Sequence, residues 1–363
     1  MATKYNYSRP DLVQRFEDWW HHDNHGLPLM RVVARTDTPV EPLPPYANPA
    51  ERYISAWRKI EEKRRYNAGH IYLGDSFSDL SANYGPGSMA LYLGSEPVFS
   101  PQTVWYKPCI DDPETYPPLR FDPDNKWWKS HINLYKELKA TCGDWTRLDI
   151  PDIIENIDIY AAMRDPQHAL FDIMDIPELV ETFISQIDEL YFKYYDPLFD
   201  ICVDDEGVSS YTAFFILGRG RVAKIQCDFS AMISPAQFRR FVQPSLDIQS
   251  RKLDHVLYHL DGPDAIRHVP ALMEINGIDA LQWTSGAGHF DAASNDWFVI
   301  YDQVTSAGKS LWLSISDGNV DNWIRNSEKL MSRYDKRLLY FLYPEMSMSD
   351  AEKLLTHAEK HWN

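Results

Sequence analysis

Strand-like apolar runs alternate with helix-like segments through the C-terminal half of the chain, at the spacing of β-strand–α-helix units. The four clearest apolar runs lie near 255–260, 279–283, 310–315 and 338–342, and a segment of helical character follows each of them. Four such units in succession make up half of an eight-unit barrel. The pattern therefore predicts an α/β protein with a (β/α)8 (TIM) barrel.

A well-marked helix start precedes the first of these strands. Ser234 is a suitable N-cap, Pro235 suits the first helical position, and Gln237 completes a capping box. Farther upstream, the segment 176–195 has the spacing of a long amphipathic helix. We expect that helix to lead into a strand at 197–203.

The N-terminal third is rich in proline and aromatic residues, and its elements are less regular. We expect a helix at 49–66 and strands near 28–34, 69–74 and 103–109. No internal repeat, low-complexity run or change in composition marks a linker. The sequence therefore predicts one domain over 1–363, a barrel with an N-terminal helical and loop extension.

The composition is that of a globular protein, with 44% hydrophobic and 25% charged residues. No stretch approaches the roughly 18 consecutive apolar residues that cross a bilayer, and residues 1–5 begin no apolar signal segment. The four cysteines lie far apart and form no CxxC pair, which argues against a disulfide scaffold or a structural zinc finger. We therefore expect a protein of the cytoplasm.

The charge balance narrows the classes of partner. A formal net charge of −17 argues against nucleic acid and against anionic lipid surfaces, both of which attract basic proteins. The chain contains no Walker P-loop, no GxGxxG after a strand, no GxSxG elbow and no HExxH helix. A small-molecule or protein partner is therefore expected, and nucleotide-dependent or serine-hydrolase chemistry is disfavoured.

The strand near 256–261 carries the most informative polar residues. Its period of two places His259 and Asp261 on one face, and the pair Gly262–Pro263 then ends the strand. Barrel enzymes carry their active sites at this C-terminal end. An isolated HxD pattern more often only satisfies buried polarity, but this placement favours a pair that chelates a metal or acts as an acid or base.

Neighbouring strand ends supply further candidates. Asp228 ends the preceding strand on its polar face, whereas Cys227 falls on the apolar face and is either a buried small hydrophobe or a ligand. Glu206 lies in an acidic run that follows another expected strand, although such runs are usually solvated turns. Tyr258 and the strand-end Trp283 are candidates for substrate contacts, with a core position as the alternative for Trp283.

Two of these segments carry a family resemblance. Residues 234–244 follow the form SPxxFxxFVxP, and residues 259–262, His-Leu-Asp-Gly, are similar to an HxCG segment. In both respects the chain resembles the uroporphyrinogen decarboxylase superfamily, which includes the decarboxylase itself and the zinc- and corrinoid-dependent methyltransferases. The resemblance covers roughly residues 165–345.

The resemblance implies a barrel whose site lies at its C-terminal face. In the methyltransferase branch the HxC residues and a later thiolate bind zinc, but here Asp261 replaces the first cysteine and no cysteine follows Cys227. The resemblance nevertheless implies transfer of a methyl group from a methyl ether, alcohol or amine to a corrinoid carried by a partner protein. Zinc would lie at His259 and Asp261, with Glu206 and Asp228 as further ligands or proton-handling groups. A homodimer is common among the members.

Two alternatives stay open. Arg31 and Arg35 resemble the arginine pair with which the decarboxylase binds substrate carboxylates, and Asp79 lies in a Phe-Ser-Asp segment like that of its catalytic aspartate. The apolar spacer between the two arginines is, however, more typical of a buried strand. The other alternative is a catalytically inactive barrel that serves as a binding subunit.

Overall fold

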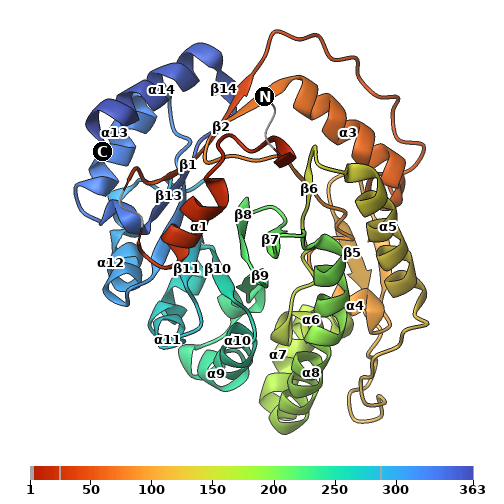
Figure 1. The fold of residues 1–363 in the computed structure, drawn as a ribbon. Coiled ribbons are helices and arrows are strands. Elements are labelled where there is room, and N and C mark those ends of the chain that lie inside the picture. The colour runs from red at the N-terminus through yellow and green to blue at the C-terminus, as the bar shows by residue number, and fades with distance from the viewer. Residues whose placement is uncertain (1–3, 24–25, 287, 363) are drawn as a thin grey trace.

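The computed structural model describes residues 4–23, 26–286 and 288–362, and it shows a mixed α/β protein in which helices surround a curved central sheet (Figure 1). Residues 1–3, part of the segment considered for a leader, lie outside the described residues. None of the described helices is both long and apolar enough to span a lipid bilayer.

The central sheet has eight strands, and apart from β2 its neighbouring strands run parallel. Its strands, in spatial order, are β14 (Met346–Ser347), β1 (Leu29–Arg35), β13 (Leu339–Leu342), β12 (Ser310–Ser314), β11 (Ala280–Thr284), β10 (His255–Asp261) and β9 (Val222–Gln226), with β2 (His70–Gly74) antiparallel to β1. Parallel strands bury both faces. The near-continuous burial of β9 to β13 agrees with this rule.

The sheet resembles a TIM barrel but does not close through continuous strand pairing, which corrects the expectation of a complete eight-stranded ring. Three small sheets lie outside it: β3 (Asp79–Leu80) with β6 (Arg147–Leu148), β4 (Glu96–Phe99) with β5 (Val104–Lys107), and β7 (Val208–Tyr211) with β8 (Ile216–Arg219). Between β9 and β1, the gap is bridged by β7, β6 and β3. A single bridge joins Ile150 to Tyr211, and the Asp75 amide donates to the Met30 carbonyl.

Strand β8 pairs with β7 and lies inside the arc of strands, where a closed barrel holds side chains alone (Figure 1). Tyr340 and Trp312 donate to the carbonyls of Phe215 and Phe214 in its turn, at 2.9 and 2.8 Å. At the other end, Trp20 of α1 (Leu12–Trp20) donates to the carbonyl of Leu217 at 2.9 Å. The turn and the far end of β8 are thus held by residues of β12, β13 and α1.

The expected C-terminal strand–helix units are confirmed, because each of β10 to β13 is followed by helical structure. The helices after α1 are α2 (Glu51–Ile54), α3 (Ala56–Ala68), α4 (Met89–Tyr92), α5 (Lys126–Cys142), α6 (Asn156–Arg164), α7 (Pro166–Asp175), α8 (Pro177–Cys202), α9 (Pro235–Phe241), α10 (Gln243–Ser250), α11 (Val269–Met273), α12 (Phe298–Ser306), α13 (Val320–Met331) and α14 (Met348–His361). Short 3-10 helices are η1 (Lys4–Asn6), η2 (Asp228–Met232), η3 (Pro263–His268), η4 (Asn295–Trp297) and η5 (Lys336–Leu338). The capping box at Ser234 and Gln237 is present as predicted.

One expected strand is wrong. Residues 197–203 continue helix α8 as far as Cys202, with Pro197 inside the helix. The buried side chains Tyr191, Tyr194, Leu198 and Cys202 keep helical spacing across the proline, so burial of this face outweighs the lost hydrogen bond.

The N-terminal strands β1, β2 and β5 lie where they were expected. The helix expected at 49–66 is divided at Ser55, whose side chain accepts the Arg58 amide and caps α3. Ahead of β1, α1 contributes Phe16, Trp19 and Trp20 to the buried core. The N-terminal extension thus closes the end of the sheet opposite the strands' C-terminal ends.

Candidate functional site

Three neighbouring strands present polar side chains to the interior at their C-terminal ends. His259 of β10 is paired in register with Gln226 of β9 and with Gln282 of β11, and Asp261 is paired with Thr284. Side chains that are paired across neighbouring strands point to the same face of the sheet, so these residues share one surface. The alternation read from the sequence places His259 and Asp261 correctly on one face.

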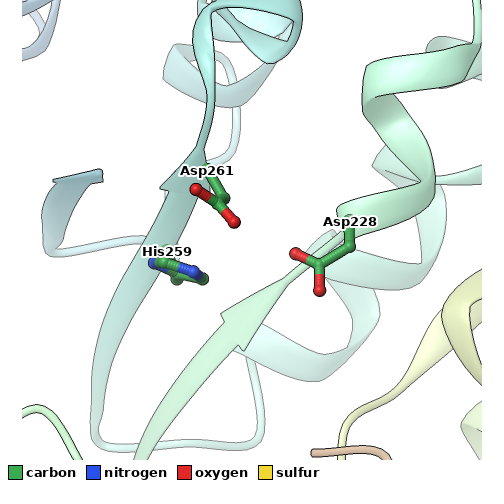
Figure 2. A group of neighbouring side chains, drawn as sticks. All are labelled: Asp228, His259 and Asp261. Atoms are coloured by element: carbon green, nitrogen blue, oxygen red, sulfur yellow. The ribbon is translucent and has the colours of Figure 1, made fainter. Parts of the chain in front are cut away.

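Asp228, His259 and Asp261 form the candidate metal centre. Each offers one ligand atom, and these atoms all lie within 4.8 Å of one another. Figure 2 shows Asp228 just beyond the end of β9, facing His259 and Asp261 on β10. His259 is half-buried and both aspartates are exposed, so the group lies at the surface of the strand ends and is open to an incoming molecule.

Gln282 fixes the imidazole of His259. Its side-chain oxygen pairs with Nδ1 of His259, and its amide nitrogen donates to Thr284 Oγ1 at 2.9 Å. Because the Gln282 oxygen is an acceptor, the proton of the neutral ring is on Nδ1, and Nε2 keeps a lone pair for a ligand. A hydrogen-bonded second nitrogen of this kind is the usual support for a metal-binding histidine.

The local charges favour a neutral imidazole. Desolvation, reinforced by the nearby Lys224 cation, lowers the pKa of His259. Although Asp228 is exposed at its edge, the protein around its carboxyl desolvates it and raises its pKa, against the attraction of His259 and Lys224. The site therefore presents an uncharged imidazole nitrogen between two carboxyl groups.

Lys224 lies beneath the group and is fully buried. Its ammonium forms a 2.7 Å ion pair with Asp152 and also donates to Gln226. Tyr211 donates to the other Asp152 oxygen at 3.1 Å, and the Phe214 ring lies 5.2 Å from the His259 ring. A paired buried charge and the hairpin turn thus form the floor of the site.

Asp158 holds the segment that carries Asp228. Its carboxylate accepts the amides of Asp228 and Phe229 at 2.8 and 2.9 Å, and the Cys227 thiol lies 3.6 Å from one oxygen. Desolvation and the nearby Asp228 raise the pKa of Asp158 to about 7. Burial also raises the pKa of Cys227 well above its ordinary value. Cys227 is not one of the three residues whose ligand atoms lie within 4.8 Å of one another.

The start of α6 adds two more contacts to the same strand end. The Glu155 carboxylate accepts the amide of Gln226, and the Asn156 side chain donates to its carbonyl, both at 2.7 Å. Ile154 and Asn156 adopt positive φ angles of 51° and 52°, which is uncommon for these residues and rare for a β-branched one. Backbone strain here accompanies the docking of α6 against β9.

The fold has a known counterpart. A methyltransferase from Methanosarcina mazei aligns over 97% of this chain and 99% of its own length, with a TM-score of 0.60 and 12% sequence identity. A structure of macrophomate synthase aligns over 64% of this chain and 80% of its own length at 12% identity, and its TM-score of 0.19 carries no argument. No protein-family model and no curated protein matches the sequence. At this identity the likeness to the methyltransferase shows a shared fold.

Tyr258 and Trp283 lie on the opposite face of the sheet from the candidate metal centre. Both are buried, and the Trp283 ring is 5.0 Å from that of Trp297 in η4. Their strand positions alternate with those of His259 and Gln282, so they face the helices. The structure therefore places them in the core, away from the group formed by Asp228, His259 and Asp261.

Glu206 and Asp79 are also separate from the three-residue group. Glu206 follows α8 rather than a strand and precedes β7, and its carbonyl accepts from Arg219 at the end of the sheet opposite the site. Asp79 begins β3 and forms a 3.2 Å ion pair with Lys63. Neither residue is part of the group formed by Asp228, His259 and Asp261.

Arg31 and Arg35 lie in different surroundings. The Arg31 guanidinium lies 3.7 Å above the Phe215 ring in the turn of the hairpin, whereas Arg35 is exposed at the end of β1. Both arginines belong to β1 and alternate in step along it, so their side chains point to the same face of the sheet. Their role as a carboxylate-binding pair stays a prediction.

Sequence reasoning missed Gln282 and Asp158 as supporting residues. The position of Gln282 was readable, since a single polar residue in the apolar run Ala280–Trp283 alternates in step with His259. Asp158 gave no comparable indication, because it is 70 residues from Asp228 and reaches it only in the folded chain.

Proposed function

We propose that this protein is a methyltransferase that moves a methyl group from a small methylated compound to a corrinoid carried by a partner protein, with zinc held by Asp228, His259 and Asp261. The observation that carries the proposal is the convergence of these three ligand atoms within 4.8 Å at the C-terminal ends of β9 and β10. The shared fold with a methyltransferase from Methanosarcina mazei supports it.

The residues fit a catalytic zinc ion. Nitrogen and oxygen ligands bind zinc at about 2.0–2.2 Å, and three protein ligands leave the fourth position open for a substrate. Asp228, His259 and Asp261 would hold the ion, and the exposure of the two aspartates would leave its open position accessible to a substrate. His259 already has the hydrogen-bonded second nitrogen that such ligands require.

In the proposed reaction, zinc polarises the substrate and the protein residues position it. When bound, zinc supplies the Lewis acidity that polarises the oxygen or nitrogen bearing the methyl group. The bond from carbon to that atom breaks, the methyl group bonds to cobalt(I), which becomes cobalt(III), and the leaving atom keeps the electron pair and takes up a proton. His259 and the aspartates hold the reacting end in place, and the exposed strand ends leave room for the partner protein.

The test combines metal content with methyl transfer. Purified protein should bind zinc and should methylate a cobalt(I) corrinoid protein from at least one donor among methanol, methylamines and methyl ethers, followed by the change in cobalt absorbance. His259→Ala and Asp261→Asn should lose both zinc and transfer. Asp264→Asn, on an exposed carboxylate three residues from Asp261, is the matched control and should keep both.

Absence of zinc together with failure of every donor would overturn the proposal. The two alternatives draw less support from the structure. The decarboxylase alternative rests on Arg31, Arg35 and Asp79 and gives no role to the group of Asp228, His259 and Asp261. A binding subunit without chemistry gives no reason for Gln282 to orient His259 beside two carboxylates.

A further inference from the structure

The turn of the β7–β8 hairpin brings an aromatic side chain against the candidate metal centre. The centre of the Phe214 ring lies 5.2 Å from the centre of the His259 ring, and the two ring planes are tilted by 58°. Phe214 is half-buried, so part of its ring is not covered by the protein. Because rings at this separation are in contact, a group bound beside the imidazole lies against Phe214.

Phe214 lies in front of several strands of the site. The Lys224 ammonium of β9 is 5.8 Å from the centre of the Phe214 ring, and the Trp312 ring of β12 is 6.1 Å from it. The register of β10, β11 and β12 places Trp312 level with His259, whereas Lys224 lies one side-chain pair deeper in the sheet. The Phe214 ring therefore separates the candidate metal centre from the interior of the sheet.

The backbone of this turn is fixed in an uncommon conformation. Ala213 and Phe215, on either side of Phe214, adopt positive φ angles of 65° and 51°. Hydrogen bonds from β12 and β13 to the carbonyls of Phe214 and Phe215 hold the turn in place. Strained backbone that several contacts support is characteristic of sites where a side chain must be placed accurately. Phe214 cannot move aside without the loss of these contacts.

We infer that Phe214 is a specificity-determining residue, whose ring limits the size of the group that binds at the candidate metal centre. The inference rests on the proposed function and adds what the site excludes. A large substituent at the atom that binds the metal would overlap the ring, and a closely packed side chain yields only at a cost in free energy. Donors with small substituents at that atom are therefore favoured over donors with bulky ones.

Two ligands of different size test this limit without the partner protein. The protein is loaded with cobalt(II) in place of zinc, because the visible absorption of cobalt(II) changes when a ligand binds. Imidazole and 4-phenylimidazole bind a metal through the same kind of nitrogen, and they differ by one ring. The natural chain should bind imidazole roughly tenfold more tightly than 4-phenylimidazole. Equal or tighter binding of 4-phenylimidazole would overturn the inference.

Replacement of the ring should remove the limit. Phe214→Ala should bind 4-phenylimidazole roughly tenfold more tightly than the natural chain does, with imidazole affinity changed by less than about twofold. Phe214→Trp should still bind cobalt(II) but should weaken imidazole binding roughly tenfold. Circular dichroism checks that each variant is folded. An unchanged ratio of the two affinities in Phe214→Ala would contradict the assignment.

The neighbouring ring of the same turn provides the matched control. Phe215 is also half-buried, but its ring lies 3.7 Å from the Arg31 guanidinium. Phe215→Ala should therefore keep the ratio of the natural chain. An equal shift of the ratio in Phe215→Ala would show that a loosened hairpin, rather than the Phe214 ring, changes the binding.

Failure of this inference is distinguishable from failure of the proposed function. If methanol methylates the corrinoid protein but Phe214→Ala leaves the ratio unchanged, the methyltransferase stands and Phe214 does not limit the site. If the ratio shifts as expected but no donor methylates the corrinoid, the size limit stands and the proposed function fails. If the natural chain binds no cobalt(II), the proposed metal centre fails and this inference fails with it.

Discussion

A single amide determines which nitrogen of His259 is free for a ligand. Gln282 accepts from Nδ1 and is itself held by its hydrogen bond to Thr284. Desolvation of the ring and then the neighbouring ammonium of Lys224 lower the pKa of His259, which favours the neutral, ligating form of the ring. The two aspartates carry the negative charge of the site, whereas Gln282 sets the orientation of the His259 ring.

Replacing Gln282 should therefore weaken zinc binding without removing a ligand. We expect Gln282→Leu to lower zinc affinity by about 10–100-fold, the usual effect of losing the partner of a metal-bound histidine. Competition with a chromophoric chelator measures the affinity. Gln282→Glu keeps an acceptor for Nδ1 and should retain most of it. Full affinity in the leucine variant would show that His259 is oriented by something else.

Asp188, which lies far from the candidate metal centre, should make the stability of the folded protein depend on pH. It lies buried in α8, where Ser245 and Gln249 of α10 donate to its carboxyl, and desolvation raises its pKa to about 7. The folded protein thus binds this proton more tightly than the unfolded chain does. The stability that it contributes is complete at low pH and is lost as the pH rises from about 4 to 7.

Asp188→Asn should remove that dependence. The natural chain should lose about 2–3 kcal/mol of unfolding free energy from pH 5 to pH 8 through Asp188, and the variant should not, since each unit of pKa shift corresponds to about 1.4 kcal/mol. Urea unfolding midpoints at the two pH values give the comparison. Parallel changes in the two proteins would mean that Asp188 ionises in the folded state as it does in the unfolded chain.

At the level of elements, local patterns predicted the strands that carry the site. Period-two alternation correctly placed His259 and Asp261 on one face, and the capping box located the start of α9. The strand predicted at 197–203 is wrong because the buried residues on either side of Pro197 keep helical spacing and continue α8 to Cys202.

The β7–β8 hairpin lay beyond the reach of such patterns. Its turn contains no glycine, yet Ala213 and Phe215 adopt positive φ angles of 65° and 51°. Contacts far along the chain, from Tyr340 and Trp312 to the turn, hold this conformation. Tertiary packing therefore decides the turn, and with it the open form of the barrel.

The hairpin should contribute substantially to stability because it occupies the interior. Leu217 of β8 is fully buried beneath α1, and Leu217→Ala should lower the unfolding free energy by about 2–5 kcal/mol. Denaturant unfolding followed by circular dichroism measures the loss. Val299→Ala, at a side chain that is 56% exposed, is the control and should change the free energy by less than about 0.5 kcal/mol. Similar small effects in both variants would mean that the hairpin is dispensable for packing.

The whole molecule places two different environments side by side at one end of the sheet. The candidate metal centre lies at the ends of β9 and β10, and Asp228 also lines a largely apolar cavity of about 680 Å³ whose wall includes Val104 and Phe229. α6 holds the boundary between them through Asp158, Glu155 and Asn156. Because Asp228 belongs to both, metal binding should influence the order of the entire wall.

Metal binding should consequently stabilise the folded chain as a whole. A ligand that binds only the folded state adds about 2.7 kcal/mol at a concentration one hundred times its dissociation constant. Zinc should therefore raise the thermal unfolding temperature by several degrees, and a chelator should reverse the rise. His259→Ala and Asp261→Asn should abolish the increase, whereas Asp264→Asn should preserve it. An equal rise in all four proteins would show that zinc binds elsewhere, because the free energy of binding would then not depend on the ligands that β10 contributes.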